Sequence, residues 1–190
     1  VKKLIESFNN NEDIHTETAK KVFGVEEITP DMRRSAKIIN FSIVYGTTSF
    51  GLSKRLNNNK KEAENYINNY FKTYPEIKQY MKNTIDFASK NGYTETLLGR
   101  KCYINLINSK GIHKQFLERL AINSPIQGTG ADIIKMATIE LQEKLKNFDA
   151  KILLQIHDEL VIEVKTEIAN NIARIVKDTM ENIIKLSVPL

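Results

Sequence analysis

The sequence predicts an α+β chain that is mainly α. Apolar residues recur at helical spacing through most of the 190 residues, and proline, glycine and asparagine separate these segments. Only a few segments, rich in Ile, Leu and Val or alternating around a glycine, have the pattern of strands. An apolar fraction of 41% is enough for a core, and this length suits one ordinary domain or two small ones.

Capping residues delimit the helices of the first half. Asp13 precedes a short helix over IHTETAKKVF, which a glycine follows as a stop. Thr29 and the proline after it open a second helix, from about Asp31 to Tyr45, which also stops at a glycine. Two further helices are predicted over KKEAENYINNYFKTY and PEIKQYMKNTIDFASK.

The second half contains two predicted hairpins and three predicted helices. Residues 93–104 alternate loosely around a Leu-Gly turn, and the apolar runs KILLQI and LVIEV flank the tight turn His-Asp-Glu at 157–159. One helix covers about residues 113–123 and breaks at Pro125. The next starts at the capping pattern of Thr129, and the last covers about residues 167–184.

Composition narrows the class of protein. A net charge of +5 and a pI near 9.1 suit a polyanionic partner. Cys102 is the single cysteine, which excludes an internal disulfide and a cysteine-rich zinc site and favours a reducing compartment. No apolar run approaches a membrane span, and the opening VKKLIESF has no apolar signal core, so we expect a soluble protein that is not secreted and has no membrane partner.

A stripe of two cations followed by two aromatics occupies every fourth position of the second helix: Arg33, Lys37, Phe41 and Tyr45. Apolar residues on the opposite side can anchor that helix in a core. The cations can then grip a phosphate chain, and the rings can stack on a sugar or base. The alternative is a solvated amphipathic helix whose aromatics pack inward.

The second hairpin turn offers carboxylates at a strand end. Asp158 and Glu159 are hard oxygen ligands of the kind that phosphoryl-transfer enzymes use to position magnesium. His157 is interpreted as a positioning residue, because magnesium favours oxygen ligands. An ordinary acidic turn is the alternative, since Asp is a common turn residue.

A third polar series consists of Arg119, Asn123 and Gln127, with the last residue just past the expected break at Pro125. Arginine can hold a backbone phosphate, and the amides can hydrogen-bond base edges or sugar oxygens. Helix capping and solvated side chains are the alternative interpretation.

Together these motifs resemble the family A DNA polymerases, of the bacterial DNA polymerase I type. RRSAKIINFSIVYG is similar to the family's fingers motif, and LLQIHDELVIEV is similar to its palm motif. The segments DIHTETAKKVFG, TYPEIKQYM, GYTETLLGRKCYI and ERLAINSPIQGTGADIIK resemble family stretches in the same order, so the similarity covers almost the whole chain.

The resemblance implies a role for each residue of the stripe. Arg33 and Lys37 would contact the incoming triphosphate together with His15, and Lys37 is a candidate proton donor to the leaving pyrophosphate. Phe41 would lie against the deoxyribose, a position that in this family governs rejection of dideoxynucleotides. Tyr45 would close the pocket beside the templating base.

The resemblance also implies a metal site and a DNA contact surface. Asp158 would be a ligand of the catalytic Mg²⁺ ions, two in the complete enzyme, with Glu159 nearby in a catalytic role. The residues expected to contact primer–template DNA are Arg100, Arg119, Asn123, Gln127 and His157. The implied partners are that DNA and deoxynucleoside triphosphates, and the protein is expected to act as a monomer in a bacterial cytoplasm or an organelle.

The family fold is a right hand, so residues 1–125 are expected to form a helical fingers subdomain and residues 126–190 part of the palm. The family's other metal-binding aspartate and its ribose-excluding glutamate precede the segment that matches here. We therefore expect the chain to be a fragment of a longer polymerase, inactive in isolation. The alternatives are a single-subunit RNA polymerase, or a catalytically inactive DNA-binding module of the same fold.

Overall fold

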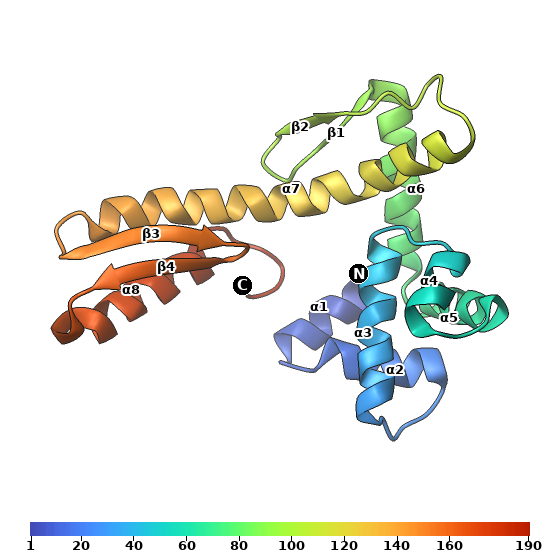
Figure 1. The fold of residues 1–190 in the computed structure, drawn as a ribbon, viewed down its shortest axis with the longest axis horizontal. Helices are drawn as coiled ribbons and strands as arrows, with labels where there is room; N and C mark the ends of the chain where they lie inside the picture. Colours follow the sequence, from blue (N-terminus) through green and yellow to red (C-terminus); the bar gives the residue numbers. More distant parts are fainter. The chain divides into compact units, whose positions relative to one another are not determined.

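The computed structural model describes all 190 residues and divides into two compact units, Val1–Gly128 and Thr129–Leu190. The division falls three residues after the predicted boundary at 125. Both units are rich in helix, and each contains one two-stranded antiparallel sheet (Figure 1). The predicted class, α+β and mainly α, is therefore confirmed. None of the helices combines the length and apolar character needed to cross a membrane.

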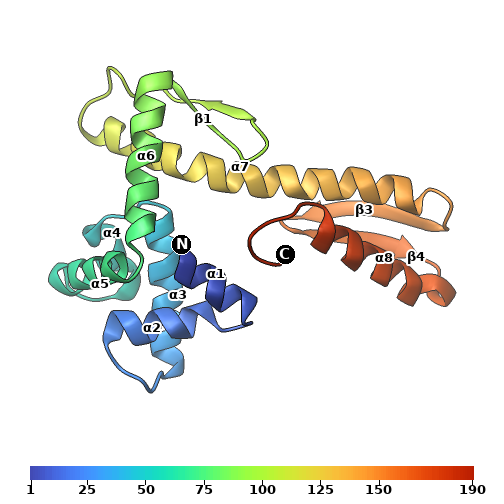
Figure 2. The ribbon, with the colours of Figure 1, turned by 180° about the vertical axis from the view of Figure 1, so that it is seen from behind.

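The elements that begin in the first unit are α1 (Lys2–Asn9), α2 (Ile14–Phe23), α3 (Pro30–Val44), α4 (Ser49–Leu56), α5 (Lys60–Thr73), α6 (Pro75–Asn91), β1 (Tyr93–Glu95), β2 (Lys101–Tyr103) and α7 (Gly111–Leu145). Helix α7 crosses the division between the units. The remaining elements are β3 (Ala150–Ile156), β4 (Glu159–Val164), the 3₁₀ turn η1 (Thr166–Ile168) and α8 (Ala169–Asn182). Figure 2 shows the same elements from behind.

The predicted caps of α2 and α3 are confirmed. The Asp13 carboxylate accepts the first free N–H groups of α2, which ends at Gly24 with φ 72°. Thr29 caps α3 by accepting from the N–H of Met32, and Gly46 with φ 68° follows the end of that helix. The boundaries lie within one or two residues of those predicted, as expected for helix ends.

The core of the first unit forms around α3. Ile39 and Ile43 of α3 are buried against Val22 of α2, Leu52 of α4 and Tyr70 of α5. This packing buries one face of α3 and leaves the opposite face exposed. Figure 1 shows α2 crossing α3 near its start.

One structural prediction was wrong, because Pro125 does not end the helix. Residues 111–145 form one continuous helix, α7, with Pro125 inside it. Proline removes a single N–H donor, and the Ser124 hydroxyl donates to the carbonyl of Leu120 at 2.5 Å, beside the missing bond. The free-energy cost of the hydrogen bond that Pro125 removes is therefore offset by packing of the helix on both sides of the proline, where Ala121 and Ala137 are buried.

In the second unit, β3 and β4 form the predicted hairpin. Ile156 pairs with Glu159, so His157 and Asp158 make the turn and Glu159 begins β4. The register shifts between Ile152 and Leu154, where one extra residue makes a bulge in β3. Helix α8 is held to the end of α7 by Lys144, whose Nζ donates to Thr179 Oγ1 at 3.0 Å.

Candidate functional site

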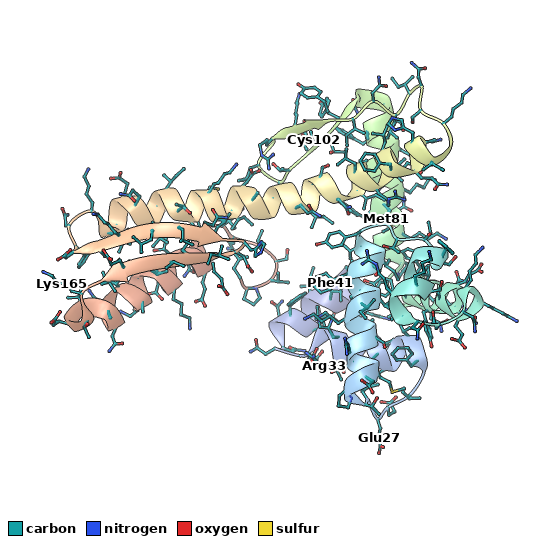
Figure 3. All side chains as sticks on the ribbon, viewed as in Figure 1. Glu27, Arg33, Phe41, Met81, Cys102 and Lys165 are labelled. Atoms are coloured by element: carbon teal, nitrogen blue, oxygen red, sulfur yellow. The ribbon has the colours of Figure 1, made fainter.

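The mixed stripe lies on the open face of α3. Arg33, Lys37 and Phe41 are exposed, Phe41 at 47%, and Tyr45 is half-buried. Figure 3 labels Arg33 nearer the start of α3 and Phe41 farther along the helix. The aromatics do not pack inward, so this face carries cations at its first turns and rings at its last.

An aromatic row joins α2 to this stripe. The rings of Phe41 and Tyr45 stack with centroids 6.4 Å apart and planes 23° from parallel. The imidazole of His15, on the first turn of α2, lies 5.9 Å from the Phe41 ring. The structure therefore brings three of the predicted nucleotide-binding residues into one row.

The Asp13 carboxylate ties Arg33 of the stripe to α2. Asp13 Oδ1 accepts from the N–H of His15 at 2.9 Å and of Thr16 at 3.3 Å, while Oδ2 accepts from Arg33 Nε at 2.5 Å. The hydrogen bond from Arg33 and those from the backbone outweigh desolvation and lower the pKa of Asp13 to about 2. Asp13 is therefore a carboxylate at any working pH.

The surroundings of His15 favour its neutral form. Burial is the main cause that lowers its pKa below 6.5, and the neighbouring cations Arg33 and Lys37 lower it further against the opposing charge of Asp13. The Asn40 amide nitrogen lies 3.0 Å from the ring atom Nδ1. A neutral imidazole in this position can still donate one hydrogen bond to a phosphate oxygen.

The open face of α3 borders a concavity of about 640 Å³ that is lined by Arg34, Lys37, Ile38, Phe41 and Arg55. Sequence reasoning missed two of these cations. Arg34 stands outside the four-residue spacing of the stripe, although its position next to Arg33 was a usable signal. Arg55 belongs to α4, which was not predicted, and its Nη1 reaches Ser42 Oγ at 3.5 Å.

The predicted DNA-contact residues of the first unit lie along and beside α7. Arg119, Asn123 and Gln127 share one face, because the helix continues through Pro125. The Oδ1 atom of Asn123 is buried without a hydrogen-bond partner. Gln127 is exposed, and Arg100 from the β1–β2 hairpin donates through Nη2 to the carbonyl of Gly128 at 3.0 Å.

The end of α3 lies directly against this face. A Cβ built on Gly46 would come within 3.0 Å of Arg119 Cγ and 3.7 Å of a methyl carbon of Ile122. Glycine is needed at this position for two reasons, because its φ is also positive at 68°. The backbone that directly follows Tyr45 therefore packs on the side chain of Arg119.

In the second unit, the turn presents its polar side chains to solvent. His157, Asp158 and Glu159 are all exposed, and His157 has φ 54°. Its carbonyl accepts from Gln155 Nε2 at 2.7 Å. The two carboxylates offer the oxygen ligands that Mg²⁺ prefers. No three His, Cys, Asp or Glu side chains of the chain cluster closely enough to hold a metal ion. Asp158 and Glu159 would therefore supply only part of a magnesium ligand set.

The comparisons with known proteins agree over the whole chain. The model of DNA polymerase family A matches residues 1–190. The DNA polymerase I of Caldicellulosiruptor bescii is 48% identical over 99% of this chain, and that of Borreliella burgdorferi is 48% identical over 98%. The chain spans 23% and 21% of the lengths of these relatives.

A solved structure is similar as well. It is the POL domain of Pol1 from M. smegmatis in complex with DNA primer-template and dNTP, at a TM-score of 0.92 and 38% identity. The match covers 98% of this chain and 34% of that chain. The predicted fold, that of a right-hand polymerase, is confirmed by this likeness. By sequence and by fold, the chain belongs to the family A DNA polymerases.

Proposed function

We propose that the protein to which this chain belongs carries out template-directed DNA synthesis, adding deoxynucleotides to a primer 3′ end. The observation that carries the proposal is the open face of α3, where Arg33 and Lys37 precede the stacked rings of Phe41 and Tyr45. Cations followed by aromatics match the order of phosphates, sugar and base in a nucleoside triphosphate. The relatives named DNA polymerase I support a DNA product over an RNA product.

The triphosphate would bind along the first turns of α3. Arg33 presents the forked guanidinium that pairs with phosphate oxygens, and Lys37 adds a point charge one turn further on. His15 lies on the same side and would donate from its ring to a phosphate oxygen. Held by these three donors, the α-phosphorus is oriented for attack by the primer 3′ oxygen.

Bond formation leaves negative charge on the departing pyrophosphate. We assign Lys37 as the group that donates a proton to the leaving oxygen as the bond to the α-phosphorus breaks. Mg²⁺, with Asp158 as a ligand and Glu159 nearby, would stabilise charge on the phosphoryl oxygens. Phe41 would pack on the sugar, and Tyr45 would lie beside the templating base.

Primer–template DNA would follow the polar face of α7. Arg119 would contact a backbone phosphate, while Asn123 and Gln127 would hydrogen-bond base edges or sugar oxygens. Arg100 and His157 are further proposed contacts. In this proposal residues 1–125 act as the fingers and residues 126–190 as part of the palm, close to the division of the chain at Gly128. The enzyme would be a monomer in a bacterial cytoplasm or an organelle.

The test is primer extension by the protein that contains this chain, with Lys37→Ala compared to Lys61→Ala. Lys61 is an exposed lysine of α5, so Lys61→Ala removes the same charge at a position outside the stripe. We expect Lys37→Ala to slow single-turnover extension by roughly a hundredfold or more, as losses of a general acid do, and Lys61→Ala to leave it unchanged. If the wild-type protein binds primer–template DNA but does not extend the primer, the protein is instead a DNA-binding module.

A further inference from the structure

Asp13 holds two parts of the proposed triphosphate site at once. Its Oδ1 caps α2 and fixes the backbone of His15, and its Oδ2 accepts from Nε of Arg33. The two segments are twenty residues apart in the sequence. A single carboxylate thus couples the helix that carries the imidazole to the helix that carries the guanidinium.

The contact with Asp13 leaves the terminal nitrogens of Arg33, Nη1 and Nη2, available for other partners. A guanidinium has five N–H donors, of which Nε carries one. The hydrogen bond and ion pair of the Arg33 side chain both involve Nε, and 49% of that side chain is exposed. The terminal nitrogens Nη1 and Nη2 therefore remain for the forked interaction with phosphate oxygens.

The negative charge of Asp13 is compensated where it stands. Its two oxygens receive two backbone N–H groups at the start of α2, where the helix dipole favours an anion, and the Arg33 cation. The carboxylate can therefore stay in place when a triphosphate arrives. Fixing a long arginine side chain beforehand reduces the conformational entropy that binding would otherwise cost.

We propose that Asp13 is a positioning residue that holds Arg33 through Nε, so that the two terminal nitrogens of Arg33 are aimed at the phosphates of the incoming nucleotide. This inference rests on the proposed triphosphate site on α3. Asp13 itself touches neither the nucleotide nor the metal. Its effect should therefore appear in nucleotide affinity and depend on Arg33.

The informative variant is Asp13→Asn, because Asn caps a helix about as well as Asp does but lacks the charge that holds Arg33. Glu17→Gln is the matched control, since Glu17 is another carboxylate in the first turn of α2 and pairs with Lys20 at 2.7 Å. The readout is the equilibrium affinity of a complementary dNTP for the protein on a primer–template whose primer ends in a dideoxynucleotide.

We expect Asp13→Asn to weaken dNTP affinity by roughly twofold to fivefold, the range of a partly exposed ion pair. Glu17→Gln should not change it. Arg33→Ala should weaken affinity more, and adding Asp13→Asn to Arg33→Ala should then have no further effect. The melting temperature of Asp13→Asn should stay within a few degrees of wild type, which separates positioning from unfolding.

Two results would overturn the inference alone: unchanged or tighter dNTP affinity in Asp13→Asn, or the same loss with and without Arg33. If Arg33→Ala itself leaves dNTP affinity unchanged, the triphosphate site on α3 is wrong, and the inference fails with it. Adding Asp13→Ala completes the series, because a loss seen only in Asp13→Ala belongs to the helix cap and also counts against the proposal.

Discussion

The side-chain nitrogen of Asn40 lies 3.0 Å from Nδ1 of His15 and 3.1 Å from the Thr18 hydroxyl oxygen. Thr18 donates its only hydroxyl hydrogen to the carbonyl of Ile14 at 2.7 Å, so its hydroxyl oxygen accepts from the Asn40 amide. The two hydrogens of the Asn40 amide then serve Thr18 and His15. Nδ1 of His15 therefore accepts, and the neutral ring carries its hydrogen on Nε2.

The first prediction concerns Asn40→Ala. The change removes the amide that donates to the buried Thr18 oxygen and to Nδ1 of His15, so we expect the free energy of unfolding to fall by about 1–3 kcal/mol. Urea unfolding measures this. Asn83→Ala is the control, because Asn83 is exposed and only accepts from Gln79. Equal stability of the two variants would mean that the buried network contributes nothing.

The second prediction is a pH dependence carried by His15. Its folded pKa is lowered below 6.5, chiefly by burial, so the unfolded state binds more protons in the window just below pH 6.5. Stability should fall as the pH falls through that window and level off below the folded pKa. His15→Gln should remove this part of the slope, as seen in melting temperatures between pH 5 and 8.

A second variant tests the same group with the opposite sign. Asn40→Asp places a charged acceptor against Nδ1 of His15, so it should raise the pKa of His15 and reverse the slope.

The third prediction is that Phe41→Tyr relaxes discrimination against dideoxynucleotides. Phe41 is 47% exposed and stacked on Tyr45, so a hydroxyl fits without repacking and can replace the missing 3′-hydroxyl of the sugar. A hydrogen bond of ~1 kcal/mol gives about fivefold or more in relative incorporation. Competition assays measure this, with Phe87→Tyr on α6 as control. An unchanged preference for deoxynucleotides would place Phe41 away from the sugar.

The sequence predicted the local parts of this site well. The four-residue stripe on α3, its caps and the turn at 157–159 all follow from periodicities and capping rules that act over a few residues. The orientation of α3 also follows, because Ile39 and Ile43 leave no other face to bury. These features depend only on interactions between residues that lie within a few positions of one another in the sequence.

The long-range parts could not be predicted in this way. The contacts of Asp13 with Arg33 and of Asn40 with His15 join residues 20 and 25 positions apart, and no periodicity encodes them. Helices α1 and α4 were missed because they have only eight residues each, fewer than the window over which a helical repeat is usually assigned. The predicted helix break at Pro125 was wrong because the tendency of proline to end a helix applies to isolated segments. In this chain the helix packs on both sides of the proline and continues through it.

The fourth prediction is that Asp158→Ala abolishes nucleotide addition while duplex binding stays nearly intact. Asp158 is exposed in the hairpin turn, so its removal leaves no cavity and should not change the fold. Losing a metal ligand commonly costs thousands-fold in rate, ~4 kcal/mol or more in activation free energy. Rapid-quench extension and DNA binding are measured on the same preparation. Near-normal extension with magnesium would remove Asp158 from the catalytic site.

The last prediction separates the two duties of His157, which occupies a turn at φ 54° and is a proposed DNA contact. A non-glycine residue at positive φ stores roughly 1 kcal/mol of strain or more, and glycine adopts this conformation freely. The carbonyl that accepts from Gln155 survives any substitution. His157→Gly should therefore leave the melting temperature unchanged or slightly raised.

If the imidazole also contacts DNA, His157→Gly should weaken primer–template affinity despite this gain in stability. His157→Val is the opposing variant, because a β-branched residue is strained at this φ and should lower the melting temperature. Binding measured by anisotropy at several salt concentrations distinguishes the two duties. Unchanged affinity in His157→Gly would leave His157 with a role in the turn alone, and a loss of affinity that tracks melting temperature in both variants would assign the effect to the hairpin fold.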